Sequence, residues 1–383
     1  MIISRLALTN WRNFRSADVA LGRRVFVIGP NASGKSNFLD VFRFLRDIVK
    51  PGGGLQEAVL ERGGVSKIRC LAARRDPLIC IDVHFSESPG GPEEWRYELG
   101  IKQEGGSGLR QTQVKYERVW HGEKKVLDRP DEDDIADPLR LSETHLQQVN
   151  ANKAFREIHA FFGEVAYLHL IPQLLRYPEA FSSYRLPGDP FGGLLLNHIV
   201  EANKKTRVSR LRKIERALRL AVPQLKELKI TQDGNGIPHL EAIYEHWREH
   251  GAKQNEAQFS DGTLRLIGLL WSLLNSDSLL LLEEPELSLH PALVSQIPGL
   301  MHRLQSKKKR QVIISTHSID LLKDQGIGGE EVLLLIPGSE GTSLRVTSDV
   351  QEIRTLLESG LTVAEAAFPK TVPPSAEQLG LFE

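Results

Sequence analysis

Eight consecutive residues near the start of the chain have the types and spacing needed to hold a row of phosphate groups. They read GPNASGKS and fit the G-x-x-x-x-G-K-[ST] phosphate-loop pattern. Glycines let backbone N–H groups turn inward around phosphate oxygens, Lys35 would reach the outer phosphates and act in catalysis, and the Ser36 hydroxyl would hold Mg²⁺. The alternative is a glycine-rich turn that happens to precede a helix. We interpret the segment as a nucleoside triphosphate site, with contacts expected from Gly29, Pro30, Asn31, Ala32, Ser33, Gly34, Lys35, Ser36 and Asn37.

Two acidic residues and a histidine follow apolar strands far along the chain and could act on those phosphates. The apolar run Leu279–Leu282 ends in Glu283 and Glu284. The apolar run Val312–Ser315 is closely followed by His317. A buried strand that ends in acids delivers charge beside the phosphates, so Glu283 would contact Mg²⁺ through a water and Glu284 would act as the general base. His317 could sense or polarise the γ-phosphate, and the ordinary alternatives are an acidic turn and a structural histidine.

A second helix start carries small polar residues that could bind another phosphate. Residues 259–263 read FSDGT and precede a predicted helix that runs to Leu274. Ser260, Gly262 and the free N–H groups of this helix start would form an anion site, although a simple Ser/Asp helix cap explains the same pattern. Two phosphate sites at helix N-termini in one chain suggest ATP held between two copies, each giving one site. We therefore expect a homodimer or a higher homo-oligomer.

The elements that would position these residues come from both ends of the chain. Arg24–Ile28 is predicted to be a buried strand entering the phosphate loop, and Asn37–Val49 a helix leaving it. In the last third, Val332–Ile336 is another apolar strand and Pro291–Leu304 a helix. The prediction is an α/β fold in which both chain ends build one nucleotide-binding core, with the ligand at the carboxyl ends of parallel strands.

Between these ends the sequence changes character. Short antiparallel strands are expected at 78–85, 94–102, 111–120 and 124–127, and a solvated acidic loop at 131–137. A mostly helical section is expected from about 142 to 222, interrupted near 172–193. At the N-terminus, a strand at 2–8 is followed by a turn through 10–15. The expected division is an N-terminal ATPase part (1–85), a β-rich and helical insertion (86–255), a C-terminal ATPase part (256–345), and a C-terminal helix and tail (346–383).

The overall composition excludes some classes of protein. Of the 383 residues, Lys plus Arg and Asp plus Glu each number 49, so the net charge indicates neither a nucleic-acid nor a membrane partner. Cys70 and Cys80 form no disulfide or metal framework and suit a reducing compartment. We find no apolar run long enough to span a bilayer and no signal-peptide core, so we expect a cytoplasmic protein without a membrane partner.

The ordered set GPNASGKS, FSDGT, LLLLEEPELSLHP and STHS resembles the ABC-type ATPases of the SMC/RecF-like branch. The resemblance is strongest to stand-alone ATPases related to the overcoming-lysogenization-defect (OLD) proteins. Residues 8–15 also look like that branch's "NFR" opening, which adds Arg12 to the expected nucleotide contacts. The resemblance implies ATP and Mg²⁺ as ligands, with Walker A at 29–36, Walker B at 283–284, the signature motif at 260–263, the D-loop at 287–290 and the switch histidine at 317.

The sequence departs from the family pattern at several places. Glu283 stands where many relatives have Asp, and the signature reads Ser-Asp-Gly-Thr where transporters have Ser-Gly-Gly-Gln. The Q-loop glutamine has only a weak candidate in Gln173, after the apparent strand 165–170. Fewer than seventy residues follow His317, too few for the Toprim nuclease domain of OLD-type nucleases. We therefore expect a separately encoded effector, which could be a nuclease.

Two further segments could meet a partner. Lys204–Arg219 is predicted to be a basic amphipathic helix that could follow the phosphates of DNA or RNA, although a solvated helix face explains it equally well. Lys307–Arg310 is expected to be an ordinary exposed loop. The tail residues Gln378–Phe382 (QLGLF) resemble the short motif that docks on the DNA sliding clamp, against the alternative that they pack on their own domain.

Together these observations predict an ATP-hydrolysing ABC-type ATPase that dimerises around ATP and drives a DNA-directed partner in antiphage defence or DNA maintenance. One alternative is a low-turnover switch that binds ATP to scaffold a partner, which the glutamate at position 283 keeps open. The motor subunit of a membrane transporter is a third reading, and the signature sequence argues against it.

Overall fold

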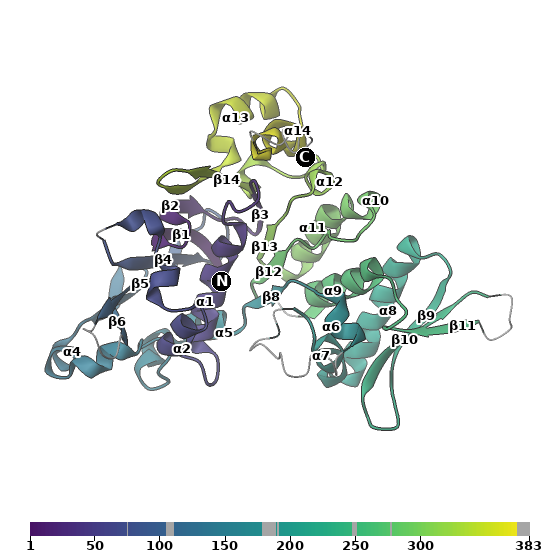
Figure 1. The fold of residues 1–383 in the computed structure, drawn as a ribbon, viewed down its shortest axis with the longest axis horizontal. Coiled ribbons are helices and arrows are strands. Elements are labelled where there is room, and N and C mark those ends of the chain that lie inside the picture. Colours follow the sequence, from purple (N-terminus) through teal and green to yellow (C-terminus); the bar gives the residue numbers. More distant parts are fainter. Residues whose placement is uncertain are drawn as a thin grey trace, which may run out of the picture.

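The computed structural model has a central sheet from which further parts extend on either side (Figure 1). It describes residues 1–74, 76–104, 111–177, 189, 191–246, 251–275 and 278–373, and at 306–308 the backbone alone. The central sheet has six strands in the order β15-β14-β3-β13-β12-β8. Their bounds are β3 (Arg24–Ile28), β8 (Ala166–Leu168), β12 (Leu280–Glu283), β13 (Val312–Ser315), β14 (Val332–Gly338) and β15 (Gly341–Val346).

The central sheet joins segments from both ends of the chain, as the sequence predicted. Strand β3 lies between β13 and β14 and is parallel to both, and β13 is also parallel to β12. All residues of β3 and β13 are buried, which explains why they read as unbroken apolar runs. Strand β8, from the middle of the chain, adds to β12 in parallel, and β15 closes the other edge as an antiparallel hairpin partner of β14.

Helices cover both faces of this sheet. Alternate residues of a strand point to opposite faces, so each central strand contributes side chains to a core on either side. Val25 and Val27 of β3 pack into a core with α1 (Lys35–Val49). Phe26 and Ile28 pack into a second core with α9 (Asp261–Asn275) and α11 (Ile297–Lys308). The single helix expected at 291–304 is instead two, because α10 (Pro291–Val294) ends before α11 begins.

A second six-stranded sheet, entirely antiparallel, occupies the left side of Figure 1 in the order β2-β1-β4-β5-β6-β7. Its strands are β1 (Ile2–Trp11), β2 (Phe14–Ala20), β4 (Ile79–Ser86), β5 (Glu93–Glu104), β6 (Gln111–His121) and β7 (Lys124–Arg129). Strand β2 was not predicted from the sequence, where 10–15 was read as a turn alone. The strands expected in an insertion after residue 85 pair onto β4, so no sheet boundary falls there.

Short helices complete this side of the molecule. They are α2 (Leu55–Leu60), α3 (Val65–Ile68), α4 (Glu132–Ala136) and α5 (Arg156–Gly163). Helix α4 corrects the expected acidic loop at 131–137: the Asp131 carboxylate accepts a hydrogen bond from the Asp134 backbone N–H at 2.8 Å and caps the helix. Asp131 and Asp134 thus form the helix start, while Glu132, Asp133 and Asp137 are exposed.

The right side of Figure 1 is a mixed part that the sequence predicted only in its helices. It contains α6 (Pro172–Arg176), α7 (Leu195–Glu201) and α8 (Lys204–Ala221). They are followed by a three-stranded antiparallel sheet in the order β11-β10-β9, with β9 (Leu225–Gln232), β10 (Pro238–Tyr244) and β11 (Ala252–Asn255). Helix α9 contributes residues to the core of this part and to the core under the central sheet, so it connects the two.

Contacts distant in sequence tie the chain ends together. The Gln311 side chain accepts from the Ile3 backbone N–H at 2.9 Å and donates to the Ile3 carbonyl at 2.7 Å. Arg24 at the start of β3 donates to Glu331 at 2.7 Å, just before β14. The helices α12 (Ile319–Leu322), α13 (Gln351–Glu358) and α14 (Val363–Ala367) lie at the top of Figure 1. Among the described residues, no helix has the length and apolar character needed to cross a bilayer.

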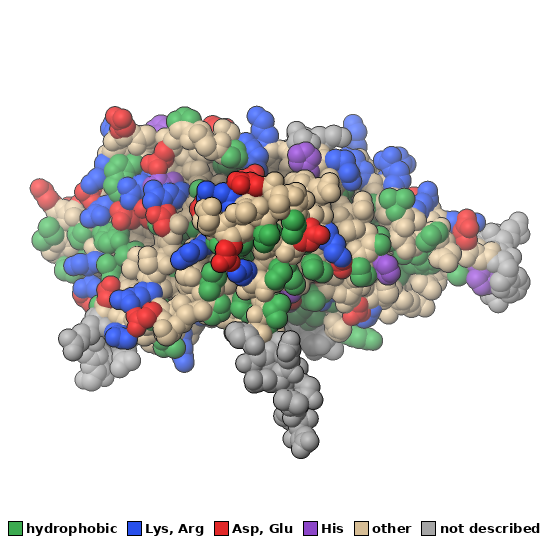
Figure 2. All heavy atoms as spheres, turned by 90° about the horizontal axis from the view of Figure 1, so that it is seen from above, with side chains coloured by type: hydrophobic (Ala, Val, Ile, Leu, Met, Phe, Trp, Pro, Cys, Tyr) green, Lys and Arg blue, Asp and Glu red, His purple; other side chains and the backbone are tan. Residues whose placement is uncertain are grey.

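The surface is mixed in charge, in keeping with the equal numbers of acidic and basic residues. On the left of the face seen in Figure 2, Lys and Arg side chains lie beside Asp and Glu side chains. Toward the upper right of that face, Lys and Arg gather with fewer acidic neighbours. A charged partner would therefore meet a local patch and not a field that covers the molecule.

Candidate functional site

The predicted phosphate loop connects β3 to α1, which is the strand–loop–helix context that the pattern requires. Ala32 (φ 60°) and Gly34 (φ 100°) adopt the left-handed backbone conformation that turns the loop. A Cβ atom on Gly29 would lie 2.8 Å from the Leu335 carbonyl oxygen, so the loop passes β14 too closely for a side chain. Gly34 gives α1 no side-chain cap, which leaves the N–H groups of the helix start for an anion.

Lys35 is folded back onto the loop that precedes it. Its ammonium group donates to the carbonyl oxygens of Gly29 at 3.0 Å and of Pro30 at 3.1 Å, and the residue is 7% exposed. Burial lowers the pKa of Lys35 to about 8, although the carboxylates of Glu284 and Glu283 act in the opposite direction. The loop thus places a cation that titrates near neutral pH where the outer phosphates would lie.

Glu283, at the end of β12, faces the start of α1. The Ser36 hydroxyl donates to one Glu283 carboxylate oxygen, and the Tyr167 hydroxyl from β8 donates to the other. Burial and the negative charge of Glu283 raise the pKa of Tyr167, which keeps that hydroxyl protonated as a donor. Tyr167 was not predicted from the sequence. A hydroxyl beside a carboxylate suits Mg²⁺, which takes one or two protein oxygens and completes its shell with water and phosphates.

Glu284 and His317 also come together, from the ends of β12 and β13. The His317 Nε2 atom lies 3.5 Å from a Glu284 carboxylate oxygen. Glu284 has φ 45°, an uncommon backbone conformation for a residue with a side chain, and its N–H donates to the Ser315 carbonyl at 2.9 Å. Burial and the nearby Lys35 lower the pKa of His317, against the effect of Glu284, so the imidazole is neutral at pH 7.

Glu286 holds the segment that carries the histidine, and the sequence did not single it out. One of its carboxylate oxygens accepts from the Thr316 hydroxyl at 2.6 Å and from the His317 backbone N–H at 3.0 Å. Burial raises the pKa of Glu286 in spite of these bonds. Its other oxygen is buried with no hydrogen-bond partner among the described residues. An acid two residues after the predicted pair, opposite a hydroxyl residue on the next strand, was the signal for this contact.

Arg265 of α9 is a second missed residue near the acidic pair. Burial lowers the pKa of its guanidinium, and Asp261, Glu284 and Glu286 act in the opposite direction. The helix that begins with the predicted signature motif thus carries a cation whose pKa is affected by Glu284 and Glu286.

In the opening segment, the adjacent residues Arg12 and Asn13 make different contacts. Arg12, expected to contact the nucleotide, donates to Asp40 of α1 at 3.0 Å. Asn13 lies against the phosphate loop instead: its Nδ2 atom donates to the Ala32 carbonyl at 3.4 Å, and a Cβ on Gly34 would lie 3.1 Å from it. Asn13 also accepts a hydrogen bond from the Asn37 side chain. Asn13 is thus the residue of this segment that touches the loop, while Arg12 braces α1.

The predicted signature residues make their contacts elsewhere. The Ser260 hydroxyl is 2.8 Å from the Thr263 hydroxyl, and it caps α9 by accepting from the Thr263 backbone N–H at 3.2 Å. Gly262 lies against Ser288 so closely that a Cβ would come within 2.5 Å of the Ser288 carbonyl oxygen. Arg176 of α6 pairs with Asp261 at 2.5 Å. Among the described residues, none of these contacts reaches the phosphate loop of the same chain.

The remaining predicted residues are placed as follows. Gln173 lies at the start of α6, five residues after β8 ends, and its Q-loop role stays a prediction. The expectation of an exposed loop at 307–310 is wrong for Arg310, which is buried and donates to the Ser278 carbonyl at 2.7 Å. The side chains of Lys307 and Lys308 lie outside the described residues, as does the whole segment Gln378–Phe382.

Comparison with known proteins agrees with this geometry. The sequence profile of the family described as "AAA domain, putative AbiEii toxin, Type IV TA system" matches residues 24–323, so the chain belongs to that family. A search of curated proteins found no match.

Solved structures are similar to this chain at low identity. A structure of the SmcHead bound to the C-winged helix domain of ScpA is 13% identical over 90% of this chain and 98% of its own, with a TM-score of 0.50. The SMC head domain from Thermotoga maritima is 14% identical over 90% and 99%, with a TM-score of 0.46. The Smc head domain with an extended coiled coil, bound to the C-terminal domain of ScpA derived from Pyrococcus furiosus, is 11% identical over 93% and 98%, with a TM-score of 0.49. The fold is that of an SMC-head type P-loop ATPase domain, whereas a relation to OLD proteins is not among these findings.

Proposed function

We propose that this family member hydrolyses ATP with Mg²⁺ at a site that two copies of the chain complete. The observation that carries the proposal is the convergence of three strand ends on one loop. Ser36 is hydrogen-bonded to Glu283, and His317 lies 3.5 Å from Glu284. Phosphate binding, metal binding and water activation would then occur within one cluster of side chains.

Each residue of the cluster has a proposed role. Lys35 exchanges the carbonyls of its own loop for the β- and γ-phosphate oxygens. Ser36 and Glu283 hold Mg²⁺, which neutralises charge on the phosphates when it is bound. Glu284 accepts the proton of the attacking water, and the neutral His317 imidazole donates to the γ-phosphate oxygen. Glu286 positions His317 through its backbone N–H.

The second copy supplies the signature motif. Ser260 and the start of α9 make no contact with the phosphate loop of their own chain among the described residues, although a helix start that ends in N–H groups can bind phosphate. We propose that this surface closes over ATP bound to the partner's phosphate loop. ATP would then dimerise the chain and hydrolysis would release it.

The biological role proposed is the control of a separately encoded, DNA-directed effector in antiphage defence or DNA maintenance. Two points support it: the family description includes a toxin of a type IV TA system, and two of the similar SMC head structures hold a ScpA domain. One observation supports the alternative of a low-turnover switch. Position 283 is a glutamate where many relatives have aspartate, and the longer side chain would change the coordination of the metal.

The test compares wild type with Glu284→Gln and Glu330→Gln, the latter an exposed-loop control outside the cluster. We expect Glu284→Gln to lower the ATP turnover number about 100-fold or more while ATP binding is retained, since a general base contributes about 10²–10⁴-fold. Light scattering should show an ATP-dependent dimer that persists in Glu284→Gln and dissociates in wild type. Equal turnover in wild type and Glu284→Gln would remove Glu284 from the role of base, and slow turnover with a persistent dimer in wild type would favour the switch.

A further inference from the structure

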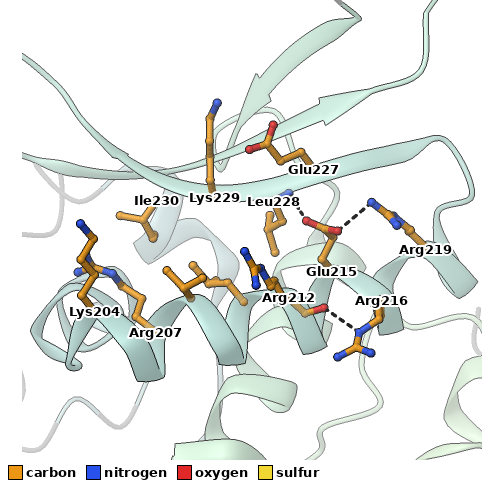
Figure 3. Close-up of a pocket in the computed structure, with 12 residues that line it drawn as sticks. Lys204, Arg207, Arg212, Glu215, Arg216, Arg219, Glu227, Leu228, Lys229 and Ile230 are labelled. Carbon is orange, nitrogen blue, oxygen red and sulfur yellow. Dashed lines mark hydrogen bonds and ion pairs between the residues drawn. The ribbon is translucent and has the colours of Figure 1, made fainter.

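A groove between α8 and β9 stands apart from the nucleotide cluster (Figure 3). It has a volume of about 620 Å³ and is open along its length. In the close-up, the basic side chains of α8 line one side and the strand β9 passes along the other. The lining residues of α8 recur every three or four positions, from Lys204 to Arg219, so they form one face of the helix. The groove therefore runs the length of α8.

The charge of this face is largely uncompensated. Arg219 is paired with Glu215 at 2.8 Å and donates to two β9 carbonyls, so it belongs to the structure of the groove. Lys204, Arg212 and Arg216 line the groove with no carboxylate within ion-pair distance among the described residues, and the Arg216 guanidinium is turned away from β9, toward the Arg212 carbonyl (Figure 3). Desolvated opposite charges attract strongly, so a partner that enters the groove should carry acidic groups.

The floor of the groove is aliphatic. Val208, Leu211, Leu228 and Ile230 line it, and Val208 remains 40% exposed although it lies on a packed helix. None of the described residues that line the groove is aromatic. Single-stranded nucleic acid binds by stacking its bases on aromatic rings, and a phosphate backbone gains nothing from an aliphatic floor. The combination favours an occupant with apolar as well as acidic side chains, which is a peptide.

Strand β9 is an edge strand, and part of its edge is open. It pairs with β10 on one side, while on the other the Leu228 N–H donates to Glu215 at 3.0 Å and the Lys226 carbonyl accepts from Arg219. The outward direction recurs at every second residue of a regular strand, so the N–H and C=O of Ile230 also point away from β10. An extended peptide can add to such an edge by backbone hydrogen bonds.

The dimensions of the groove agree with an extended occupant. The α8 face from Lys204 to Arg219 is about 22 Å long at 1.5 Å per residue. An extended segment rises about 3.3 Å per residue, so roughly seven residues would span this length.

We propose that the α8–β9 groove binds an extended segment of a partner protein in which acidic and aliphatic side chains alternate. The aliphatic side chains would cover the floor around Val208 and Ile230, and the carboxylates would meet Lys204, Arg212 and Arg216. The backbone of the segment would continue the β11-β10-β9 sheet by pairing with Ile230.

A segment bound in the groove would act on the predicted signature motif through α8. This second part of the proposal rests on the proposed function. The C-terminal end of α8, at Leu218, Ala221 and Val222, lines a cavity of about 190 Å³ together with Ser260 and Gly262. Arg210 of α8 donates to Asn275 of α9 at 2.7 Å. A segment that shifts α8 therefore shifts the surface that closes over ATP.

The experiment uses the full chain without nucleotide and a fluorescein-labelled eight-residue peptide of alternating glutamate and valine. The groove variant is Arg212→Glu with Arg216→Glu. The control variant is Lys205→Glu with Lys213→Glu, which makes the same change of charge on the same helix at exposed residues outside the groove lining. Fluorescence anisotropy at 100 mM salt measures binding, and thermal unfolding confirms that both variants fold.

We expect the groove variant to weaken peptide binding at least 30-fold and the control variant less than threefold. An octaglutamate peptide should bind at least tenfold more weakly than the alternating peptide, because it leaves the aliphatic floor exposed. Ile230→Pro removes the outward N–H without touching the β10 ladder and should weaken binding more than Ile230→Ala does. Equal losses in the two charge variants, tighter binding of a 20-nucleotide oligothymidine than of the peptide, or no binding of the peptide would each overturn the proposal.

The two proposals can fail separately. If the peptide binds in the groove but wild type hydrolyses no ATP, the groove stands and the proposed function is lost. If wild type hydrolyses ATP and Glu284→Gln does not, but the peptide fails to bind, the groove proposal alone is lost. If both hold, the peptide should change the wild-type turnover number at least twofold and leave that of the groove variant unchanged; no change in wild type would end the coupling to the signature motif.

Discussion

The phosphate-loop half and the signature half of the candidate site are built in different ways. At the loop, four elements converge: Ser36 of α1 bonds Glu283 of β12, Tyr167 of β8 bonds the same carboxylate, and His317 follows β13. At the predicted signature, the Ser260 side chain bonds only its near neighbour Thr263 among the described residues, and Gly262 packs against Ser288. The first half therefore already brings together side chains from several elements, whereas the second makes only local contacts.

This difference predicts which residues affect ATP binding to a single chain and which act only when two chains associate. A pocket with fixed donors needs little rearrangement to bind, and its residues should affect ATP affinity in a single chain. Residues of the predicted signature, which we propose act on the nucleotide of a second chain, should affect turnover only when two chains associate. The following variants separate these two kinds of effect.

The largest effect is expected for Lys35→Ala. It should weaken ATP binding about 100-fold, because roughly 2–3 kcal/mol of charge-assisted hydrogen bonding to phosphate is lost. Ser260→Ala should change the affinity of dilute, monomeric protein less than about twofold, since a neutral exposed contact is not yet made. Titration of a fluorescent ATP analogue at low protein concentration measures both. A loss in Ser260→Ala as large as in Lys35→Ala would show that the two halves act within one chain.

A smaller effect is expected for Glu286→Ala, which removes the acceptor of the Thr316 hydroxyl and the His317 N–H. We expect the turnover number to fall about 10- to 50-fold, or roughly 1.5–2.5 kcal/mol, with little change in KM. Glu286→Gln keeps an acceptor oxygen and should recover most of the activity. Steady-state kinetics decides the point, and a rise in KM alone would assign Glu286 to nucleotide binding and not to positioning His317.

ATP affinity should also depend on pH through Lys35. Burial lowers its pKa to about 8 in the empty site, so the ammonium is present at pH 7 and mostly lost at pH 9. Affinity should therefore fall about tenfold between these pH values, since each pH unit above the pKa removes the charged form by a factor of about ten. Lys35→Arg stays charged and is the control. A flat profile for wild type would mean that the Lys35 pKa lies well above 9.

The smallest effect is expected on the signature side, from Gly262→Ala. Its new Cβ would lie 2.5 Å from the Ser288 carbonyl oxygen, so the helix start must move away from the segment that holds Ser288. We expect the free energy of unfolding to fall by about 1–2 kcal/mol and Tm to fall by a few degrees. Gly234→Ala, with open space around it, is the matched control. Calorimetry measures the difference, and unchanged stability with unchanged turnover would show that this close packing is dispensable.

The sequence predicted the core of the fold well because its signals are local and strong. Unbroken apolar runs such as Arg24–Ile28 and Val312–Ser315 are central strands of a parallel sheet, and the charged residues that end them were visible directly. Strands β2, β9, β10, β11 and β15 were not predicted, and two of them show the physical reason. Phe14–Ala20 alternates buried and exposed residues within a polar stretch, and Leu225–Gln232 carries charges on an exposed edge.

The residues of the candidate site likewise divide into those that the sequence predicted and those that it missed. The positions of Glu283, Glu284 and His317 could be predicted because they lie at the ends of two apolar strands. Tyr167 and Glu286 could not, since their roles depend on which strands become neighbours and on a backbone N–H as a partner. Arg12 bonds Asp40 and its neighbour Asn13 bonds the loop, a difference that the sequence pattern did not indicate, and the nucleotide contact expected of Arg12 stays a prediction.

The placement of β3 has a consequence for how the protein is made. Its sheet neighbour β13 begins about 290 residues later, where Val312 pairs with Arg24. At about 5–20 residues per second, a ribosome needs tens of seconds to deliver that neighbour, while β1, β2 and β4–β7 can already have assembled. During translation the apolar strand and its glycine loop must wait unpaired, so the ability to bind nucleotide arrives late. Nascent chains stalled before residue 312 should lack it altogether.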